Sequence, residues 1–518
     1  MVNATTAAKE YAYSRHKPEE ATLYKIVQNN WLSFQAQVEQ DAGYPLPDFV
    51  IKEFNEYLRC GILAHGFLRT QCEACHAEHL VAFSCKRRGF CPSCGARRMS
   101  ETAAHLVDSV LPVEPIRQWV LSFPFQLRLC LAVRPKIMAR ALEITHHAIS
   151  NYYRKKANLT KHNGKAGAVT LIQRFGGSLN LNVHFHQLFL DGCYELGSQG
   201  QPVKFIATLP PTVQELEQVA AQIILRLTRY LIRQQIIVRD NDNEFQLEIP
   251  QEDTFSRLQA SSVTYRFATG PSKGKKAMVL KSLNGRMPDG DHSTSSGLVA
   301  KISGFSLHAG IATRAGERDK LERICRYIAR PAVAECRLSI NEQGDVIYKF
   351  KKPWDDGTTA IKMTQLEIME RLAALVPRPR VHLTRFHGVL APHYKYRKQI
   401  VPKKKPELAL VADPSDVTAV TAASASDGIH PADSDKPPAS AKRIAWAQLL
   451  KRVFGIDVTV CSKCSGKIKI IAAIEDPKVI KKILNHMGLA SSAPRLAPAR
   501  GPPTPDQSDM LKQNFFEN

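Results

Sequence analysis

The chain has 518 residues, 44% of them hydrophobic, which is enough apolar material for about two to four domains with cores of their own. Its 71 Lys and Arg against 48 Asp and Glu leave a formal net charge of +23, which favours a polyanionic partner, nucleic acid before an anionic membrane surface. The sequence contains no run of about 18 apolar residues and no signal-peptide pattern, which argues against secreted and membrane-spanning classes.

Hydrophobic periodicity and turn residues predict the elements in chain order. The first part holds a helical lead around Trp31, a cysteine cluster and a helix from Met99 to Leu111. Then follow a strand (117–129), a helix (136–156), a strand (168–175) with a hairpin partner across Gly176-Gly177, helices (212–236 and 317–330), two strands beside Asp356-Gly357, and a helix ending before Pro377. This mixed order predicts an α+β fold with a mainly antiparallel sheet.

Six of the twelve cysteines form three C-x-x-C pairs, a spacing typical of metal-binding or redox sites in a reducing compartment. Cys72, Cys75, Cys91 and Cys94 give C-x2-C-x15-C-x2-C, which predicts one tetrahedral structural Zn²⁺, with Gly95 supplying permissive backbone. A redox or unmetallated cluster is the alternative. Cys85 lies between the pairs as a possible substitute ligand or a ligand of a second ion.

The third pair, Cys461 and Cys464, supplies only half of a tetrahedral site. Either a zinc is completed by His486 or by a second subunit, or the pair is metal-free; both readings remain open. The residues that follow, IEDPKVIKKILNHMGL, predict an amphipathic helix with Asp476 near its N-cap.

Two basic stretches are candidate DNA contacts. The first surrounds the cysteine cluster, carries Phe90, and has Lys86, Arg87, Arg88, Arg97 and Arg98 as its cations. The second, from Arg378 to Lys405, has nine Lys and Arg, no acidic residue and three interleaved aromatics, which suits a phosphate track with stacking platforms. Its candidate contacts are Arg385, Lys395, Arg397 and Lys398. A solvated surface is the alternative for the first stretch.

The stretch LNVHFHQLFLDG, from Leu181 to Gly192, places two histidines in an apolar run. Because side chains alternate along a strand, His184 and His186 share one face, about 6.6 Å apart along it, while Val183 and Phe185 face the other way. Converging rings at that spacing can bind one divalent ion; a pair of hydrogen-bonded core histidines is the alternative. In a basic protein, a metal held by histidines indicates phosphoryl transfer.

Phosphoryl transfer of this kind needs a nucleophile, and the helix ERDKLERICRYIARP offers one. Its buried stripe is Leu321, Ile324, Cys325 and Ile328. Tyr327 lies about 110° from the centre of that stripe, at 100° per residue. The same flank carries the cations Lys320, Arg323 and Arg330. A tyrosine at the edge of a helix among cations is positioned to meet a phosphate.

The zinc cluster, VHFHQLFLDG and LERICRYIARPAVAECRL, in this order, resemble the rolling-circle transposases of the insertion-sequence 91 type, which belong to the HUH endonucleases. Further matching stretches are SCKRRGFCPSCGARRMSETAAHLVD, FSLHAG, RFHGVLAPHYKYRKQIVP and VCSKCSGKIKIIAAIEDPKVIKKIL. The resemblance implies that His184 and His186 bind Mg²⁺ or Mn²⁺ and that Tyr327 attacks a phosphate of single-stranded DNA, giving a 5′-phosphotyrosine and a free 3′-hydroxyl.

The resemblance implies an HUH-nuclease-like antiparallel sheet with flanking helices. Together with composition and the predicted elements, it divides the chain into seven segments. These are a flexible N-terminus (1–20), a zinc-binding DNA-contacting domain (21–112), the HUH catalytic domain (113–377), a basic DNA-binding extension (378–405), a disordered linker (406–442), a small C-terminal CxxC module (443–490) and a disordered tail (491–518). The expected location is the bacterial cytoplasm, at the nucleoid, with no membrane partner.

Two departures from the family pattern matter. Founding members carry two catalytic tyrosines four residues apart, whereas Arg323 and Pro331 occupy those positions around Tyr327, as in the one-tyrosine branch of common-region elements. The two cleavages then need a second subunit, as in a homodimer, a reset of Tyr327 or another hydroxyl. The sequence also lacks G-x-x-x-x-G-K-[ST], so a host helicase or the replication machinery is the expected partner for opening duplex.

The third ligand of the catalytic metal has five candidates in the sequence, and none is favoured: Gln187, Asp191, His308, Glu322 and Glu335. The rival functions are a rolling-circle replication initiator or relaxase, with the same chemistry, and a zinc-dependent DNA-binding regulator without catalysis. Relaxases usually place the tyrosine before the histidines, so the order of the motifs counts against them.

Overall fold

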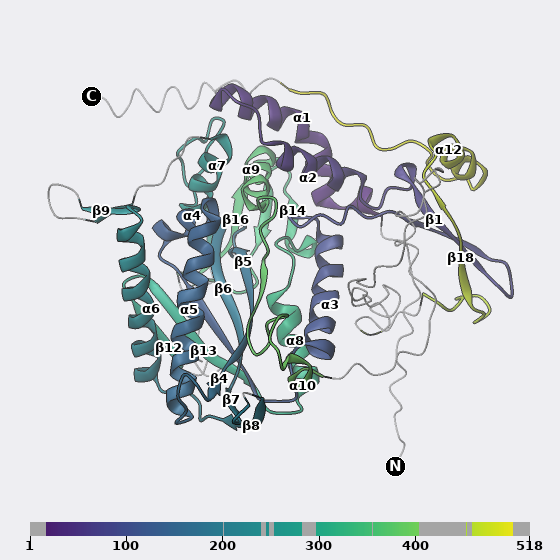
Figure 1. The fold of residues 1–518 in the computed structure, drawn as a ribbon. Coiled ribbons are helices and arrows are strands. Elements are labelled where there is room, and N and C mark those ends of the chain that lie inside the picture. Colours follow the sequence, from purple (N-terminus) through teal and green to yellow (C-terminus); the bar gives the residue numbers. More distant parts are fainter. Residues whose placement is uncertain are drawn as a thin grey trace, which may run out of the picture.

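The computed structural model describes residues 17–199, 201–239, 245–247, 253–281, 297–354, 356–402, 452 and 458–500 (Figure 1). The predicted linker (406–442) lies outside the described residues, as do most of the predicted N-terminal segment (1–20) and of the predicted tail (491–518). None of the described helices is long and apolar enough to cross a membrane.

A six-stranded sheet with the order β12-β13-β3-β6-β5-β17 forms the centre of the molecule, and each neighbouring pair is antiparallel. Its strands are β12 (Val299–Ile302), β13 (Phe305–Thr313), β3 (Ile116–Ser122), β6 (Leu181–Leu190), β5 (Gly167–Phe175) and β17 (Thr384–Gly388). The predicted α+β class with an antiparallel sheet is confirmed. Edge strand β17 comes from the predicted basic extension, so part of that stretch belongs to the sheet.

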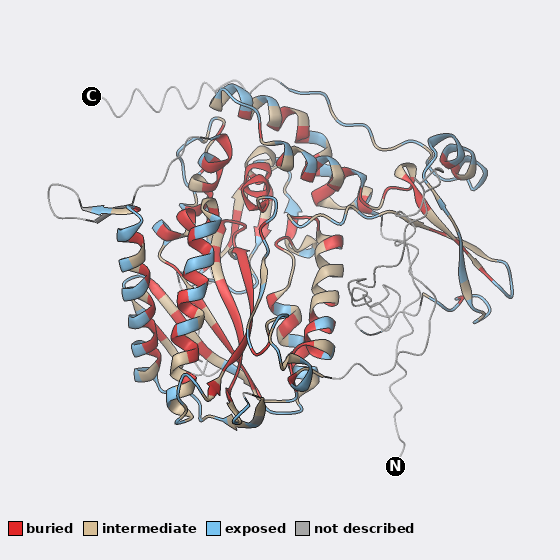
Figure 2. Cartoon of the chain, in the orientation of Figure 1, coloured by how far each residue is buried: buried red, intermediate tan, exposed pale blue. Residues whose placement is uncertain are grey.

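Helices cover both faces of this sheet (Figure 1). On one face lie α4 (Phe125–Val133), α5 (Pro135–Lys156) and α6 (Val213–Arg233), packed on Trp119 and Phe185. On the other lie α3 (Pro92–Ser109) and α8 (Arg318–Ile328), packed on the central-strand residues Val169 and Leu188. Figure 2 shows the central strands largely buried, while α5 and α6 also carry exposed residues.

The predicted strand over 117–129 is wrong in its second half. Strand β3 ends at Ser122, and α4 begins at Phe125 with Pro124 as its N-cap residue. Leu127, Cys130 and Leu131 are buried at helical spacing, which an apolar run of this length cannot distinguish from a strand. Proline at the start fixes φ near the helical value and so favours the turn into α4.

The N-terminal region, residues 17–112, packs against elements from the second half of the chain. It contains α1 (Thr22–Ala42), α2 (Asp48–Arg59), β1 (Phe67–Cys72) and β2 (Glu78–Ala82). Trp31 and Phe54 stack at 4.4 Å between ring centroids and share one core with Met369 and Leu372. Residues of the predicted zinc-binding domain (21–112) therefore complete a core with residues 255–376.

The remaining described elements surround these cores. A four-stranded sheet has the order β11 (Met278–Lys281), β16 (Thr358–Met363), β15 (Val346–Lys349), β14 (Leu338–Ile340), beside α7 (Thr254–Val263) and α9 (Gln365–Leu375). Smaller elements are β4 (Gly164–Lys165), β7 (Gly192–Leu196), β8 (Pro202–Ala207), β9 (Ile237–Arg239), β10 (Phe245–Leu247), α10 (Arg397–Ile400) and 3-10 turns at Pro18–Glu20, Leu63–His65 and Glu335–Arg337. The predicted strands beside Asp356-Gly357 are β15 and β16, which pair with each other.

The C-terminal segment joins the N-terminal hairpin. Strand β18 (Ile468–Ile474) pairs with β1 to give a three-stranded sheet, β18-β1-β2, at one side of the molecule (Figure 1). Helix α12 (Pro477–His486) places Ile480 and Leu484 against Phe67 of β1. The predicted helix is confirmed, and the Asp476 side chain accepts hydrogen bonds from the N–H groups of Lys478 and Val479.

Candidate active site and cysteine clusters

The two histidines lie on β6, between β3 and β5, on the sheet face that α3 and α8 cover. His184 is opposite Ser122 and Gln173, and His186 is opposite Val120 and Leu171. Their ring centroids are 4.9 Å apart, and Val183 and Phe185 are buried in the core of the opposite face. The predicted alternation is confirmed, and the rings are close enough to converge on one ion.

Hydrogen bonds assign the lone pairs of both rings. His184 Nδ1 lies 2.9 Å from the carbonyl oxygen of Asn182, which can only accept, so Nδ1 carries the proton and Nε2 the lone pair. His186 Nδ1 lies 2.8 Å from the Gln118 amide, whose Oε1 is buried without a partner. A half-turn of that amide lets Oε1 accept from Nδ1–H and satisfies both groups. His186 Nε2 is itself buried without a partner among the described residues, as expected for an atom that binds a metal.

Burial keeps both imidazoles neutral. It lowers the pKa of His184 to about 4, with smaller contributions from Arg330 and Arg128 against the opposing hydrogen bond to Asn182. It also lowers the pKa of His186 well below its usual range, with smaller contributions from the neighbouring His184 and from the charge of Arg330. Neutral imidazole is the form that binds metal ions, so this donor set fits a divalent cation.

Tyr327 lies on the solvent side of α8 with 44% of its surface exposed, while Leu321, Cys325 and Ile328 are buried. The Arg330 guanidinium lies 4.5 Å and the Lys351 ammonium 4.9 Å from the centroid of its ring. Lys320 instead pairs with Glu317 at 3.1 Å, and Arg323 is exposed. Sequence reasoning missed Lys351 because it comes from the segment after β15, far from the tyrosine in the chain.

The end of α8 is joined to the histidine strand pair. Gln173 Nε2 of β5, opposite His184, donates to the carbonyl oxygen of Ile328, the residue after Tyr327, at 3.3 Å. Arg330 lies 5.6 Å from the ring centroid of Phe175, and its charge acts on both histidines. Arg330 is therefore a cation that contacts the tyrosine ring and acts electrostatically on both imidazoles.

The five candidates for the third ligand separate by position. Gln187 and Asp191 lie on the opposite face; Gln187 donates to Thr170, and Asp191 forms a buried ion pair with Arg117 at 2.7 Å. Glu322 pairs with Arg452 at 2.6 Å, and Glu335 accepts from the Leu23 N–H at 3.1 Å. His308 is opposite Val120, on the face of the histidines but two strands from His186. Gln173, which lies beside His184, was not among the candidates.

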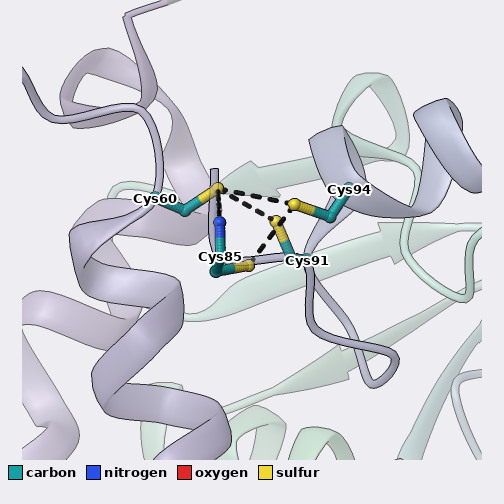
Figure 3. A group of neighbouring side chains, drawn as sticks. All are labelled: Cys60, Cys85, Cys91 and Cys94. Carbon is teal, nitrogen blue, oxygen red and sulfur yellow. Dashed lines mark hydrogen bonds between the residues drawn. The ribbon is translucent and has the colours of Figure 1, made fainter. Parts of the chain in front are cut away.

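The cysteines form two clusters, each with four sulfur atoms within 4.8 Å of one another. In the first, Cys60 ends α2, Cys85 follows β2, and Cys91 and Cys94 start α3 (Figure 3). The distances between sulfur atoms are 3.7 Å for Cys60 to Cys94 and to Cys91, and 3.4 Å for Cys85 to Cys94. A tetrahedral zinc with Zn–S bonds of about 2.3 Å separates its sulfurs by about 3.8 Å, so the geometry fits.

The second cluster joins two segments that lie far apart in the sequence. Cys72 and Cys75 lie at the end of β1, and Cys461 and Cys464 lie before β18. The sulfur atoms of Cys72 and Cys464 are 3.5 Å apart, and those of Cys75 and Cys461 are 3.7 Å apart. The residue after each pair is left-handed, with φ of 56° at His76 and 58° at Ser465. Both pairs thus form the same turn and face each other across one site.

These clusters correct the predicted grouping. Cys72 and Cys75 do not share a site with Cys91 and Cys94; each pair finds its two remaining partners elsewhere. Cys85 is a member of the first cluster, and Cys461 and Cys464 are completed by Cys72 and Cys75 of the same chain, not by His486 or a second subunit. Cys60 was missed because it is a lone cysteine outside any C-x-x-C pair.

Hydrogen bonds prepare individual sulfurs to be thiolates. The backbone N–H groups of Cys75 and Ala74, with the neighbouring thiols, lower the pKa of Cys72 to about 6. The backbone N–H groups of Lys463 and Cys464 lower the pKa of Cys461. In the first cluster, hydrogen bonds from the Cys60 and Cys85 thiols lower the pKa of Cys94, which lies in the first turn of α3. Thiolates are the form that binds zinc.

Gly95 has a role different from the predicted one. It lies within α3, and a β-carbon there would be 2.5 Å from Cβ of Pro331. Glycine is needed for the close approach of α3 to the end of α8, and not for the backbone of a metal-binding turn. The first cluster is thereby held next to the helix that carries Tyr327.

The first set of basic candidates is largely bonded within the chain. Arg97 pairs with Glu101 at 2.8 Å, Arg87 with Glu56 at 3.8 Å, and Arg98 donates to the carbonyl oxygen of Arg87 at 2.7 Å. Lys86 is exposed, and Arg88 donates to the carbonyl oxygen of Val381 at 2.7 Å. Phe90 is fully buried against Phe54 and Tyr57, so its predicted contact with nucleic acid is wrong.

The second set surrounds β17 and α10. Arg385, Lys395 and Lys398 are exposed. Arg397 donates to the carbonyl oxygen of Leu390 at 3.1 Å. Tyr396 donates its hydroxyl to the carbonyl oxygen of Gln199 at 2.9 Å, and Phe386 and Tyr394 pack partly buried on the sheet core. These aromatic rings stabilise the fold. The charged ends of Arg385, Lys395 and Lys398 are exposed and can meet phosphates, although the Lys395 ammonium also lies 5.1 Å from the centroid of the Tyr396 ring.

Two family models match the chain. Residues 26–123 match the model described as "Transposase zinc-binding domain", and residues 167–398 match the model described as "Putative transposase". The first range contains the whole first cysteine cluster, and the second contains both histidines and Tyr327. No curated protein and no solved structure matches the chain.

Proposed function

The chain belongs to the transposases of the insertion-sequence 91 type, and we propose that it nicks and rejoins single-stranded DNA through a 5′-phosphotyrosine intermediate. One observation carries the proposal. Two histidines lie on one strand, the Nε2 atom of each bonded to none of the described residues, and the helix bearing an exposed tyrosine is bonded to the neighbouring strand. Arg330 contacts the tyrosine ring and acts electrostatically on the imidazoles.

His184 Nε2 and His186 Nε2 would hold Mg²⁺ or Mn²⁺, which when bound polarises a phosphate oxygen. The carbonyl oxygen of Asn182 and the amide of Gln118 fix the two rings through their Nδ1 atoms. Burial in a sheet flanked by helices limits ring movement, so the strand presents both Nε2 atoms in one fixed arrangement.

In the proposed reaction Tyr327 Oη attacks the phosphorus of a phosphodiester and loses its proton. The bond to the 3′-oxygen breaks, and that oxygen takes up a proton as a free 3′-hydroxyl. Arg330 and Lys351, which flank the ring, would neutralise the charge on the phosphate oxygens. Rejoining is the reverse: a 3′-hydroxyl attacks the phosphotyrosine and releases Tyr327, so strand transfer needs no ATP.

The finer expectations about partners belong to the same proposal. A transposase acts on DNA, and we propose that the substrate is single-stranded DNA at element ends and target sites. The exposed cations Lys86, Arg385, Lys395 and Lys398 would contact its phosphates. A host helicase would open duplex, a second subunit could supply a second tyrosine, and the bacterial nucleoid is where this DNA lies. A non-catalytic regulator would need no exposed tyrosine on a helix bonded to the strand next to the histidines.

The metal site gives the direct test. With Mn²⁺ and single-stranded DNA from the element end, wild-type protein should form an SDS-resistant adduct, and the double variant His184→Ala/His186→Ala should form at least about 100-fold less, because both ion ligands are lost. The double variant should keep wild-type DNA affinity and zinc content. An unfolded or zinc-depleted variant would instead make the histidines structural, and a wild-type protein without any adduct would favour the regulator.

We further propose that Gln173 completes the catalytic metal site. It lies on the strand next to His184, about 4.8 Å away between strands, whereas His308 is about twice that from His186. Its Nε2 is engaged with Ile328, and no donor among the described residues bonds its Oε1. Through this amide, Gln173 would help to hold the ion while it bonds the end of the tyrosine helix to the strand.

Replacing Gln173 by leucine should raise the Mn²⁺ concentration for half-maximal adduct formation at least about tenfold. Gln173→Glu should lower it, because a carboxylate adds charge to the ligand set. The same titration of His308→Leu is the matched control and should stay at the wild-type value. A shift in His308→Leu with none in Gln173→Leu would assign the third ligand to His308.

A further inference from the structure

Arg174, near the end of β5, is a buried cation without a counter-charge. Only 5% of its surface is exposed, and its Nε and Nη2 atoms are buried with no hydrogen-bond partner. Among the described residues none forms an ion pair with it. The guanidinium is charged at neutral pH, so this arrangement is strongly unfavourable unless an anion joins it.

Two more arginines, Arg378 and Arg88, act electrostatically on Arg174. Burial, then Arg378 and Arg88, lower the pKa of Arg174 to about 10. The pairing of β5 with β17 ends at Leu171 and Thr384, and beyond it the N–H of Ile172 donates to the carbonyl oxygen of Leu383 at 2.7 Å. The segment that leads into β17, which includes Val381, therefore approaches the end of β5 that carries Arg174. Arg88 Nη1 donates to the Val381 carbonyl oxygen at 2.7 Å.

The acidic groups around this cluster are already engaged. Asp253 pairs with Arg378 at 3.3 Å, and Glu53 accepts from the N–H of Gly89 at 2.6 Å. Arg378 itself has a buried Nε without a partner. Three guanidiniums thus lie together with fewer carboxylates than they can bind. Arg88 comes from the loop before Cys91, Arg174 from the central sheet and Arg378 from the connection to β17.

We propose that Arg88, Arg174 and Arg378 form an anion subsite for a phosphate group, and that the phosphate is a phosphodiester of the DNA strand. Arg88 is exposed, Arg378 retains 27% exposure and Arg174 retains 5%, so the cluster extends inward from the surface. Guanidinium groups bind phosphate oxygens through paired N–H donors. Arg174 directly follows Gln173, at the end of the sheet that carries the histidines. The assignment to DNA rests on the proposed function, while the anion subsite itself does not.

The variant Arg174→Met tests the subsite because it removes the charge and keeps an unbranched stem. Raising inorganic phosphate against chloride at constant ionic strength should raise the melting temperature of wild-type protein by several degrees and leave Arg174→Met unchanged. In phosphate-free buffer the variant should melt no lower than wild type. Its affinity for single-stranded DNA should fall about tenfold, and the slope of log K against log salt should decrease by about 0.7 for one lost phosphate contact.

Arg226→Gln, which removes an exposed charge on α6, is the matched control and should keep the phosphate shift and the full salt slope. If Arg174→Met does not fold, the exposed Arg88→Met carries the same expectations. If Arg174→Met loses the rise in melting temperature with phosphate but binds DNA as wild type does, free phosphate is the ligand and the DNA assignment is overturned. No phosphate shift in wild type would overturn the subsite. Adduct formation at saturating DNA is measured separately, so failure of the proposed nuclease function can be distinguished from failure of the anion subsite.

Discussion

Replacing Tyr327 by phenylalanine should abolish the covalent adduct, with a fall in its rate of formation on the order of 10⁴ or more. The change removes one oxygen atom, and the ring stays between Arg330 and Lys351, so the variant should fold and bind DNA as wild type does. Gel analysis of SDS-treated reactions with labelled single-stranded DNA measures the adduct. Binding measured with the same DNA separates loss of chemistry from loss of substrate.

Tyr394→Phe is the matched control, because Tyr394 is another tyrosine within the region matched by the transposase model and is partly buried. It should form the adduct at a rate close to wild type. An unchanged adduct in Tyr327→Phe would exclude Tyr327 as the nucleophile. If Arg330→Gln lowered the rate without changing DNA affinity, Arg330 would contribute to the transition state and not only to binding.

The elements that follow from local patterns could be predicted from the sequence. The alternation of LNVHFHQLFLDG fixed the shared face of His184 and His186, and helical spacing fixed Tyr327 at the edge of its stripe. What failed depends on contacts between distant segments. Lys351 reaches the tyrosine from after β15, and Gln173 reaches the tyrosine helix across a strand pairing. Nothing in the spacing of either residue records those contacts.

The cysteines also show that local spacing does not predict contacts between distant segments. The pattern C-x2-C-x15-C-x2-C is the same whether its pairs share one ion or each joins other cysteines. The deciding partners are Cys60, which no motif marks, and the pair Cys461 and Cys464, almost 390 residues after Cys72. Phe90 was misjudged for a similar reason: its cationic neighbours indicate a surface, but α2 buries its ring.

Because the two cysteine clusters bind different parts of the fold together, losing each should have a different effect. Cys60→Ser should remove one of two zinc ions. It should also break the packing of α2 against α3, because the first cluster lies in the core with Phe54 and Phe90. Structural zinc contributes about 10 kcal/mol or more to the folding of small zinc modules. Because the end of α8 packs on Gly95 of α3, the variant should lose adduct formation together with the cooperative melting transition of the folded protein.

Cys461→Ser should also remove one zinc but leave the central sheet intact. The second cluster holds β18 against β1 at the edge of the molecule, where Cys75 and Cys464 are exposed. The released C-terminal segment should become sensitive to protease, while adduct formation on a short oligonucleotide persists at a near wild-type rate. Zinc content, melting temperature and limited proteolysis measure these outcomes, with the buried but isolated Cys130→Ala as the control that keeps two zinc ions. Equal loss of activity in Cys60→Ser and Cys461→Ser would mean that the C-terminal segment, and not only the core cluster, holds the tyrosine helix in place.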